Sequence, residues 1–125
     1  MEVILIADED QKNRDQIAEL FDESDYQVVT ADSVDGVMGD VLRKNAKVVL
    51  LGTVFDNIPA SDLVPILKSC NRNLTIILIT NEVSLPQMRK LRREGIFYHA
   101  LKPVEAVDGQ ELLQAVQCAF NNAVH

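Results

Sequence analysis

The sequence has no tryptophan and is poor in cysteine, glycine, proline and aromatic residues. Its 125 residues include two Cys, five Gly, four Pro, two Tyr and four Phe. This composition excludes a collagen-like chain and a disulfide scaffold. Cys70 and Cys118 are too few and too far apart for a disulfide framework or a zinc site, so we expect small buried side chains in a reducing compartment.

Long apolar runs and an excess of positive charge are also missing. No run approaches the ~20 residues of a membrane helix, and the start lacks a basic signal region, so we expect a cytoplasmic chain without membrane contact. Twelve Lys and Arg oppose nineteen Asp and Glu, a net charge of −7, which disfavours direct binding to nucleic acid. A length of 125 residues with 47% hydrophobic residues predicts a single domain, 1–125.

Short apolar runs alternate with segments of helical periodicity. Continuous apolar runs predict strands buried on both faces at 3–7, 47–51 and 74–79, and weaker runs predict strands at 26–30 and 96–101. Apolar residues at helical spacing follow each run, within 12–21, 34–42, 61–67, 84–91 and 112–120. Five strands in strict alternation with helices predict an α/β fold, a parallel sheet covered by helices on both faces.

Two of these helices have unusual residues. We expect Ser61 or Asp62 to cap the third helix, with Pro65 in its opening turns, where proline is tolerated. Gly36 and Gly39 each weaken the second helix by up to ~1 kcal/mol relative to alanine, so we expect that helix to be short or frayed.

Polar residues follow several strands, at the end of the sheet where open parallel sheets bind ligands. They are the segment Asp8-Glu9-Asp10, then Thr80, then Lys102-Pro103. Singly, each has an ordinary explanation, since Asp10 can cap the first helix and a threonine often closes a strand. Together, an acidic pair, a Thr and a Lys-Pro, each after its own strand, resemble the receiver domain of two-component response regulators over nearly the whole chain.

The resemblance implies a flavodoxin-like (βα)5 fold with the parallel strand order 2-1-3-4-5. It also implies that Asp8 and Glu9, with an Asp ending the third strand, hold Mg²⁺. That third-strand Asp accepts a phosphoryl group from a histidine kinase, and Thr80 and Lys102 contact the phosphoryl oxygens, with Pro103 completing the turn. An aromatic residue on the last strand then turns inward and repacks a partner-binding surface.

The sequence departs from this pattern at two positions. Gly52 stands where the phospho-acceptor Asp is expected, and it offers neither an acceptor nor a metal ligand. Asp56 is the nearest downstream acid, either a substitute acceptor or, as we favour, a turn residue. His99 takes the position of the switch aromatic, with Tyr98 on the opposite face of its strand. Ligand counting then predicts weak or absent Mg²⁺ binding and no other cofactor.

We therefore expect a receiver-like signalling module, a pseudo-receiver that is not phosphorylated conventionally and is not an enzyme. Its expected partners are proteins, a histidine kinase or an output protein, with a homodimer as a further candidate. The contact surface would combine 87–94, the last strand and 107–120. Its basic cluster is either a solvated face or a docking site for an acidic partner. The cluster consists of Arg89, Lys90, Arg92 and Arg93.

A different class of function is a flavodoxin-like domain that binds a small ligand or cofactor. The acidic segment after the first strand argues against it, because three carboxylates would repel a phosphate group. No nucleophile and base stand together at two strand ends, which argues against an enzyme.

Overall fold

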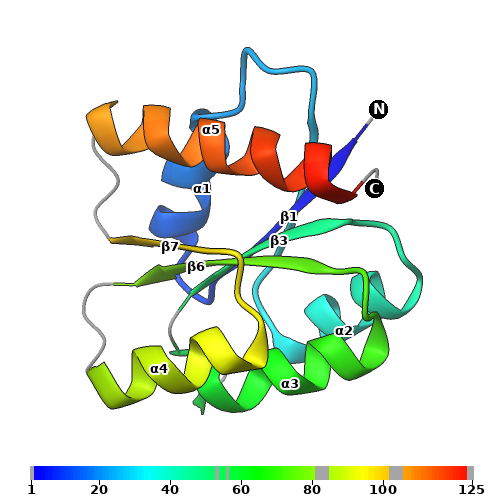
Figure 1. Cartoon of the computed structure of the whole chain (residues 1–125). Helices are drawn as coiled ribbons and strands as arrows, with labels where there is room; N and C mark the ends of the chain where they lie inside the picture. The colour runs from blue at the N-terminus through cyan, green and yellow to red at the C-terminus, as the bar shows by residue number, and fades with distance from the viewer. Residues whose placement is uncertain (1, 53, 56, 81–84, 102–105, 124–125) are drawn as a thin grey trace.

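The computed structural model describes residues 2–52, 54–55, 57–80, 85–101 and 106–123 (Figure 1). Strands and helices follow one another along the chain, with one additional pair of very short strands after β3. In order, the elements are β1 (Val3–Ala7), α1 (Gln11–Glu19), β2 (Gln27–Ala31), α2 (Val34–Leu42), β3 (Val48–Gly52), β4 (Val54–Phe55), β5 (Ile58–Pro59), α3 (Ala60–Cys70), β6 (Thr75–Thr80), α4 (Leu85–Glu94), β7 (Tyr98–Leu101) and α5 (Ala106–Ala123).

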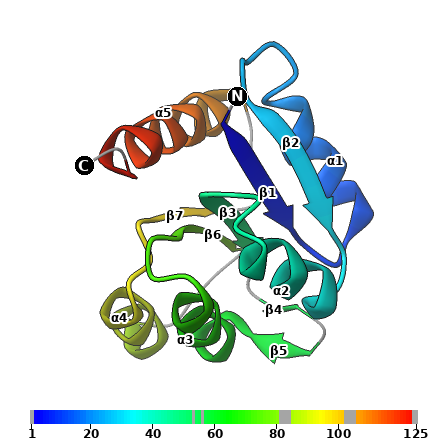
Figure 2. The ribbon, with the colours of Figure 1, turned by 90° about the vertical axis from the view of Figure 1, so that its right-hand side faces the viewer.

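The main sheet has five parallel strands in the order β2-β1-β3-β6-β7. Helices α1 and α5 cover one face, and α2, α3 and α4 cover the other (Figures 1 and 2). This is the flavodoxin-like arrangement and strand order that the resemblance implies, so both predictions are confirmed.

Alternation along the strands divides the apolar side chains between two cores. Leu5 and Ala7 of β1 pack with α2, α3 and α4, whereas Ile4 and Ile6 pack with α1 and α5. All four are fully buried. Continuous apolar runs are therefore required here, because both faces of the central strands are covered by helices.

The segment between β3 and α3 differs from the prediction. Strands β4 and β5 form a separate antiparallel pair, and α3 begins at Ala60 directly after it. Pro59 is the N-cap, with φ −65° and no side-chain cap hydrogen bond, so the predicted cap at Ser61 or Asp62 is wrong. The helix begins earlier because the fixed, extended Pro59 already sets its first turn.

The other local expectations have mixed outcomes. Helix α2 has nine residues, the same length as α1, and the Ser33 hydroxyl accepts the Gly36 N–H at 3.1 Å. Cys70 is only half-buried and Cys118 is exposed, so the expectation of two buried thiols is wrong. Cys118 lies off the buried stripe of α5, which consists of Leu112, Ala115, Val116, Ala119 and Phe120.

None of the helices in the described ranges combines the length and apolarity that a membrane span requires.

Candidate functional site

The register of the sheet places three of the predicted site residues at one edge. Ala7 pairs with Leu51, so Asp8 follows β1 beside Gly52, the last residue of β3. Thr80 is likewise the last residue of β6. Because all these strands are parallel, their carboxyl ends meet at the same edge of the sheet.

The acidic end of β1 is held by its own backbone and by α1. Asp8 is 4% exposed, and its Oδ1 accepts the Asp10 N–H at 3.0 Å. The Asp8 carbonyl accepts Arg14 Nη1 at 2.6 Å, a contact that sequence reasoning missed. Asp10 Oδ1 accepts the Lys12 N–H at 2.9 Å, so Asp10 is the helix cap and points to α1. Asp8 and the exposed Glu9 are the two acids at the end of β1 that do not cap the helix.

The third strand supplies no side chain to this pocket. Gly52 is buried and pairs with Ile79 of β6. Mg²⁺ takes oxygen ligands in near-octahedral geometry and is usually bound through one or two carboxylates, waters and substrate phosphates. Within the described ranges, no three His, Cys, Asp or Glu residues are grouped to hold a metal ion. Gly52 therefore adds no oxygen ligand to those of Asp8 and Glu9 at this edge of the sheet.

A polar pair links the ends of β6 and β7. Thr80 is fully buried, and its Oγ1 lies 2.5 Å from Nε2 of the half-buried His99. In the sheet, His99 pairs with Leu78, which lies two residues before Thr80 on β6. Side chains two residues apart on a strand point to the same face, so the side chains of Thr80 and His99 project toward the same face of the sheet. The prediction placed these two residues at one site, and the structure brings them into direct contact.

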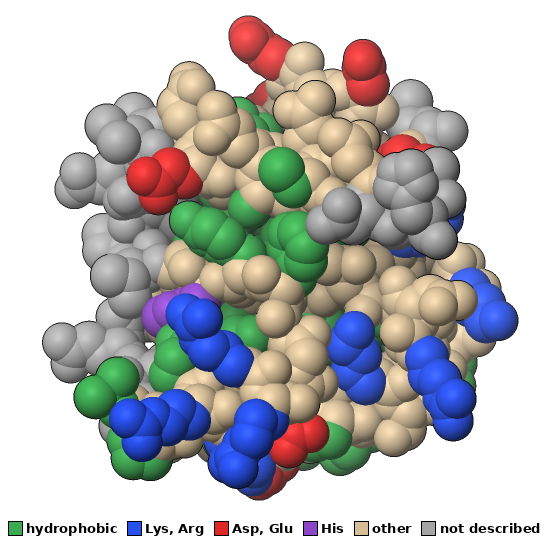
Figure 3. Space-filling view, in the orientation of Figure 1, with side chains coloured by type: hydrophobic (Ala, Val, Ile, Leu, Met, Phe, Trp, Pro, Cys, Tyr) green, Lys and Arg blue, Asp and Glu red, His purple; other side chains and the backbone are tan. Residues whose placement is uncertain are grey.

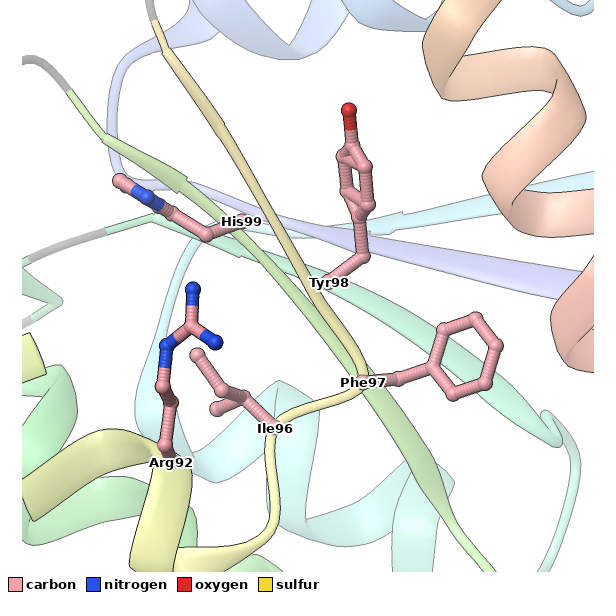
Figure 4. Close-up of a pocket in the computed structure, with 5 residues that line it drawn as sticks. All are labelled: Arg92, Ile96, Phe97, Tyr98 and His99. Carbon is pink, nitrogen blue, oxygen red and sulfur yellow. The ribbon is translucent and has the colours of Figure 1, made fainter. Parts of the chain in front are cut away.

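The neighbouring Tyr98 projects to the other face of β7, as alternation predicts (Figure 4). It packs with the apolar core under α5, and its hydroxyl donates to Glu111 Oε2 at 3.4 Å. His99 and Tyr98 therefore connect β7 to different layers of helices.

Arg92 of α4 extends toward β7 and, with Ile96, Phe97, Tyr98 and His99, lines a pocket of about 280 Å³ (Figure 4). Burial lowers the pKa of His99 below its usual value of 6.5, and the positive charge of Arg92 lowers this pKa further. The imidazole is therefore neutral at pH 7 and has one donor and one acceptor nitrogen. Sequence reasoning assigned Arg92 to a surface cluster and missed its position beside His99.

Three other predicted site residues, Asp56, Lys102 and Pro103, lie outside the described residues. Their predicted roles stay predictions.

Solved structures of receiver domains have the same fold. A CheY-like receiver domain protein from Methanospirillum hungatei has a TM-score of 0.88 at 17% identity, covering 98% of this chain and 96% of that one. A receiver domain protein from Clostridium thermocellum has a TM-score of 0.85 at 23% identity, with the same coverage. CheY4 of Vibrio cholerae has a TM-score of 0.81 at 17% identity, covering 95% of this chain and 98% of that one.

A search of curated protein sequences finds no match to this chain. A family model does match it: the response regulator receiver domain model covers residues 4–117. The match includes the five strands of the main sheet, except Val3 at the start of β1, and both residues of the Thr80–His99 pair. By this match, the chain belongs to the response regulator receiver domain family.

Proposed function

We propose that this receiver domain is a pseudo-receiver, which signals through protein contacts and is not phosphorylated in the conventional way. The observation that carries the proposal is that β3 ends in Gly52, and the resemblance puts the phospho-acceptor aspartate at the end of this strand. Glycine has no carboxylate to accept a phosphoryl group. Asp8 cannot simply replace it, because Asp8 Oδ1 already accepts the Asp10 N–H and the residue is almost fully buried.

We also propose that Mg²⁺ binding is weak or absent. Asp8 and Glu9 are the residues that would hold the ion, which would supply positive charge for a phosphoryl group. With Gly52 in β3, the site lacks one of the carboxylates that the family pattern provides. Loss of one charged oxygen ligand weakens the attraction for a small, strongly hydrated cation.

The proposed contact surface is the α4–β7–α5 face, formed by the outer sides of α4, β7 and α5. Receiver domains work with histidine kinases and output proteins, and a second copy of this chain is a further candidate partner. Figure 3 shows Lys and Arg side chains gathered over α4 and a hydrophobic patch between β7 and α5. Phe97 is 40% exposed in this region, and such a patch is typical of an interaction surface.

The proposal is tested with a phosphoryl donor. The protein is incubated with acetyl phosphate and Mg²⁺ and analysed by mass spectrometry, and beryllofluoride with Mg²⁺ is titrated in an NMR experiment. We expect no phosphoryl adduct and no shifts of the Thr80 and His99 amides. An adduct on Asp56 or Asp8 would overturn the proposal.

A pair of substitutions tests the role of Gly52 itself. Gly52→Asp restores the missing carboxylate, so we expect it to gain Mg²⁺ binding and an adduct at residue 52. Gly52→Asn has nearly the same volume without the charge, and we expect it to gain neither. If Gly52→Asp binds Mg²⁺ no better than Gly52→Asn, the missing carboxylate is not what prevents metal binding.

A further inference from the structure

The pocket between α4 and β7 brings a cation beside a titratable ring. Arg92, Ile96 and His99 line it together with Phe97 and Tyr98. Figure 4 shows the Arg92 guanidinium directed toward His99 with the Ile96 side chain beside it, whereas the rings of Phe97 and Tyr98 point away. The side of the pocket that faces α4 therefore has one positive charge, one imidazole and one apolar wall.

The guanidinium of Arg92 has no carboxylate to neutralise it in the part of the chain that the structure describes. Arg92 is exposed, and none of the ion pairs among the described residues includes it. A guanidinium presents several N–H donors in a planar fork, which matches the oxygens of a carboxylate or a phosphate group. Arg92 at the wall of a pocket is thus a ready donor to an oxyanion.

His99 meets one polar group and one charge among the described residues. Thr80 of β6 contacts its Nε2, and Arg92 of α4 is the charged group that acts on it. The segments 81–84 and 102–105, which follow β6 and β7, lie outside the described residues. A positive charge near an imidazole disfavours the protonated ring, so a negative charge placed on Arg92 favours it.

The other charges of α4 and α5 near this pocket are directed elsewhere. Lys90 Nζ lies 3.7 Å from Asp62 Oδ1 on α3, and Glu111 of α5 accepts a tyrosine hydroxyl on the other face of β7. Arg89 and Arg93 are exposed and are not among the residues that line the pocket. Arg92 is therefore the cation through which an anion in the pocket would act on the imidazole.

We propose that the pocket between α4 and β7 binds a small free oxyanion, a carboxylate or a phosphate group, on Arg92, and that this anion and a proton on His99 bind cooperatively. The pocket volume of about 280 Å³ fits such an ion with a few waters, because a water molecule occupies about 30 Å³ in the liquid. The site uses neither Gly52 nor Asp8, so the inference is independent of the proposed function.

Cooperativity between the anion and the proton is reciprocal. If the anion raises the pKa of His99, then protonation of His99 must tighten anion binding by the same factor. Two measurements, the pKa with and without the anion and the affinity at two pH values, therefore have to agree. A merely structural contact of Arg92 with the pocket predicts neither effect.

The test uses sulfate and formate as probes on the ¹⁵N-labelled full chain, followed by NMR. Sulfate represents a phosphate group and keeps its charge from about pH 8 to about pH 5, and formate represents a carboxylate. We expect at least one of them to shift the amides of Arg92, Ile96 and His99 and to raise the His99 pKa toward 6.5. Its affinity should be at least about fivefold higher at the lower pH. The stronger of the two probes identifies the chemical class.

Sodium chloride at the same ionic strength is the control for the solution conditions. Salt screens the charge of Arg92, which by itself raises the His99 pKa slightly, so the effect of the oxyanion has to exceed that of chloride. Screening also weakens exposed charge interactions generally, whereas a bound anion shifts the amides of one pocket.

Two arginines on the same helix give a matched pair of variants. Arg92→Gln should weaken the anion at least about tenfold and remove its effect on the His99 pKa. Arg93→Gln removes the same charge from the next residue, outside the pocket, and should change the affinity less than about twofold. His99→Gln keeps a hydrogen-bonding group at residue 99 that does not titrate, so the anion should still bind but without the dependence on pH.

Three outcomes would overturn the inference. They are equal effects of chloride and both oxyanions on the His99 pKa, no amide shifts with either oxyanion up to about 0.1 M, or equal weakening by Arg92→Gln and Arg93→Gln. A phosphoryl adduct with acetyl phosphate refutes the pseudo-receiver proposal separately, because the anion titration contains no phosphoryl donor.

Discussion

Thr80 Oγ1 and His99 Nε2 lie 2.5 Å apart, so a hydrogen bond joins the end of β6 to β7. Thr80 is fully buried, and without this contact its hydroxyl would lose a partner that water cannot easily replace. An apolar aromatic ring at position 99 could not make this bond. The histidine therefore gives the last strand a specific polar contact with the pocket at the carboxyl ends of the strands.

The energetic link between these two residues is testable by a double-mutant cycle. We expect Thr80→Val to lower the free energy of unfolding by about 1–2 kcal/mol, because it removes a buried hydrogen bond at nearly constant volume. His99→Phe should be less harmful in the Thr80→Val background than alone, with a coupling of about 0.5–1.5 kcal/mol. Urea denaturation measures all four proteins. Strictly additive effects would contradict the prediction, and Thr75→Val at the start of β6 is the control.

The pKa of His99 predicts how stability depends on pH. The pKa is lowered in the folded chain by burial and by Arg92, whereas in the unfolded chain it is near the usual 6.5. The unfolded state thus binds the proton first as the pH falls. The contribution of His99 is fully present above pH 6.5 and is lost as the pH falls through the folded pKa.

Denaturation at several pH values from about 8 to about 5 tests this sign. We expect His99→Phe to lose less stability than the wild type over this range. Arg92→Gln removes one cause of the shift, so the His99 pKa, followed by NMR of the imidazole ring, should rise toward 6.5. A His99 pKa that is unchanged in Arg92→Gln would contradict the role of this charge.

The main sheet could be predicted from the sequence because its strands are covered on both faces. The fully buried Ile4, Leu5 and Ile6 leave no polar position, and such an apolar run has few alternatives to a central strand. The strand order came from the resemblance rather than from periodicity. The pair formed by β4 and β5 was missed because two-residue strands have no periodicity to detect.

The candidate site was predictable in part. The positions of Asp8, Gly52 and Thr80 follow from strand ends, because parallel strands place these ends at one edge. The contact of Arg92 with the His99 pocket was not predictable, since it depends on how α4 packs beside β7. The sequence pattern of a run of basic residues is the same whether the run faces solvent or lines a groove.

A glycine within one helix and a glycine directly after another should respond oppositely to substitution by alanine. Gly39 lies within α2, where an added Cβ meets the flexible end of Arg43 at 3.3 Å, so Gly39→Ala should stabilise the protein by about 0.5–1 kcal/mol. Gly95 follows α4 with φ +100°, a conformation that alanine rarely adopts, so Gly95→Ala should destabilise it by about 1–2 kcal/mol. Thermal denaturation of both variants checks the two signs, and a loss of stability in Gly39→Ala would contradict the first.

The turn after β1 has two linked functions, and one substitution separates them. The Asp10 side chain caps α1 by accepting the Lys12 N–H, while the Asp10 N–H holds Asp8 Oδ1. Asp10→Ala removes the cap and should cost about 1 kcal/mol, whereas Asp10→Asn keeps a capping oxygen and should cost much less. Because both variants retain the backbone N–H, the Asp8 carboxylate should stay in place.

Urea denaturation measures the cost of each variant, and the NMR shift of the Asp8 carboxyl carbon reports its position. Equal stability of Asp10→Ala and Asp10→Asn would show that the cap does not stabilise α1. A shift at Asp8 in Asp10→Ala, but not in Asp10→Asn, would show that the cap also positions the acid. The first turn of α1 would then be part of the pocket in energetic terms, because a cap that loosens moves the only carboxylate at the end of β1 that is buried.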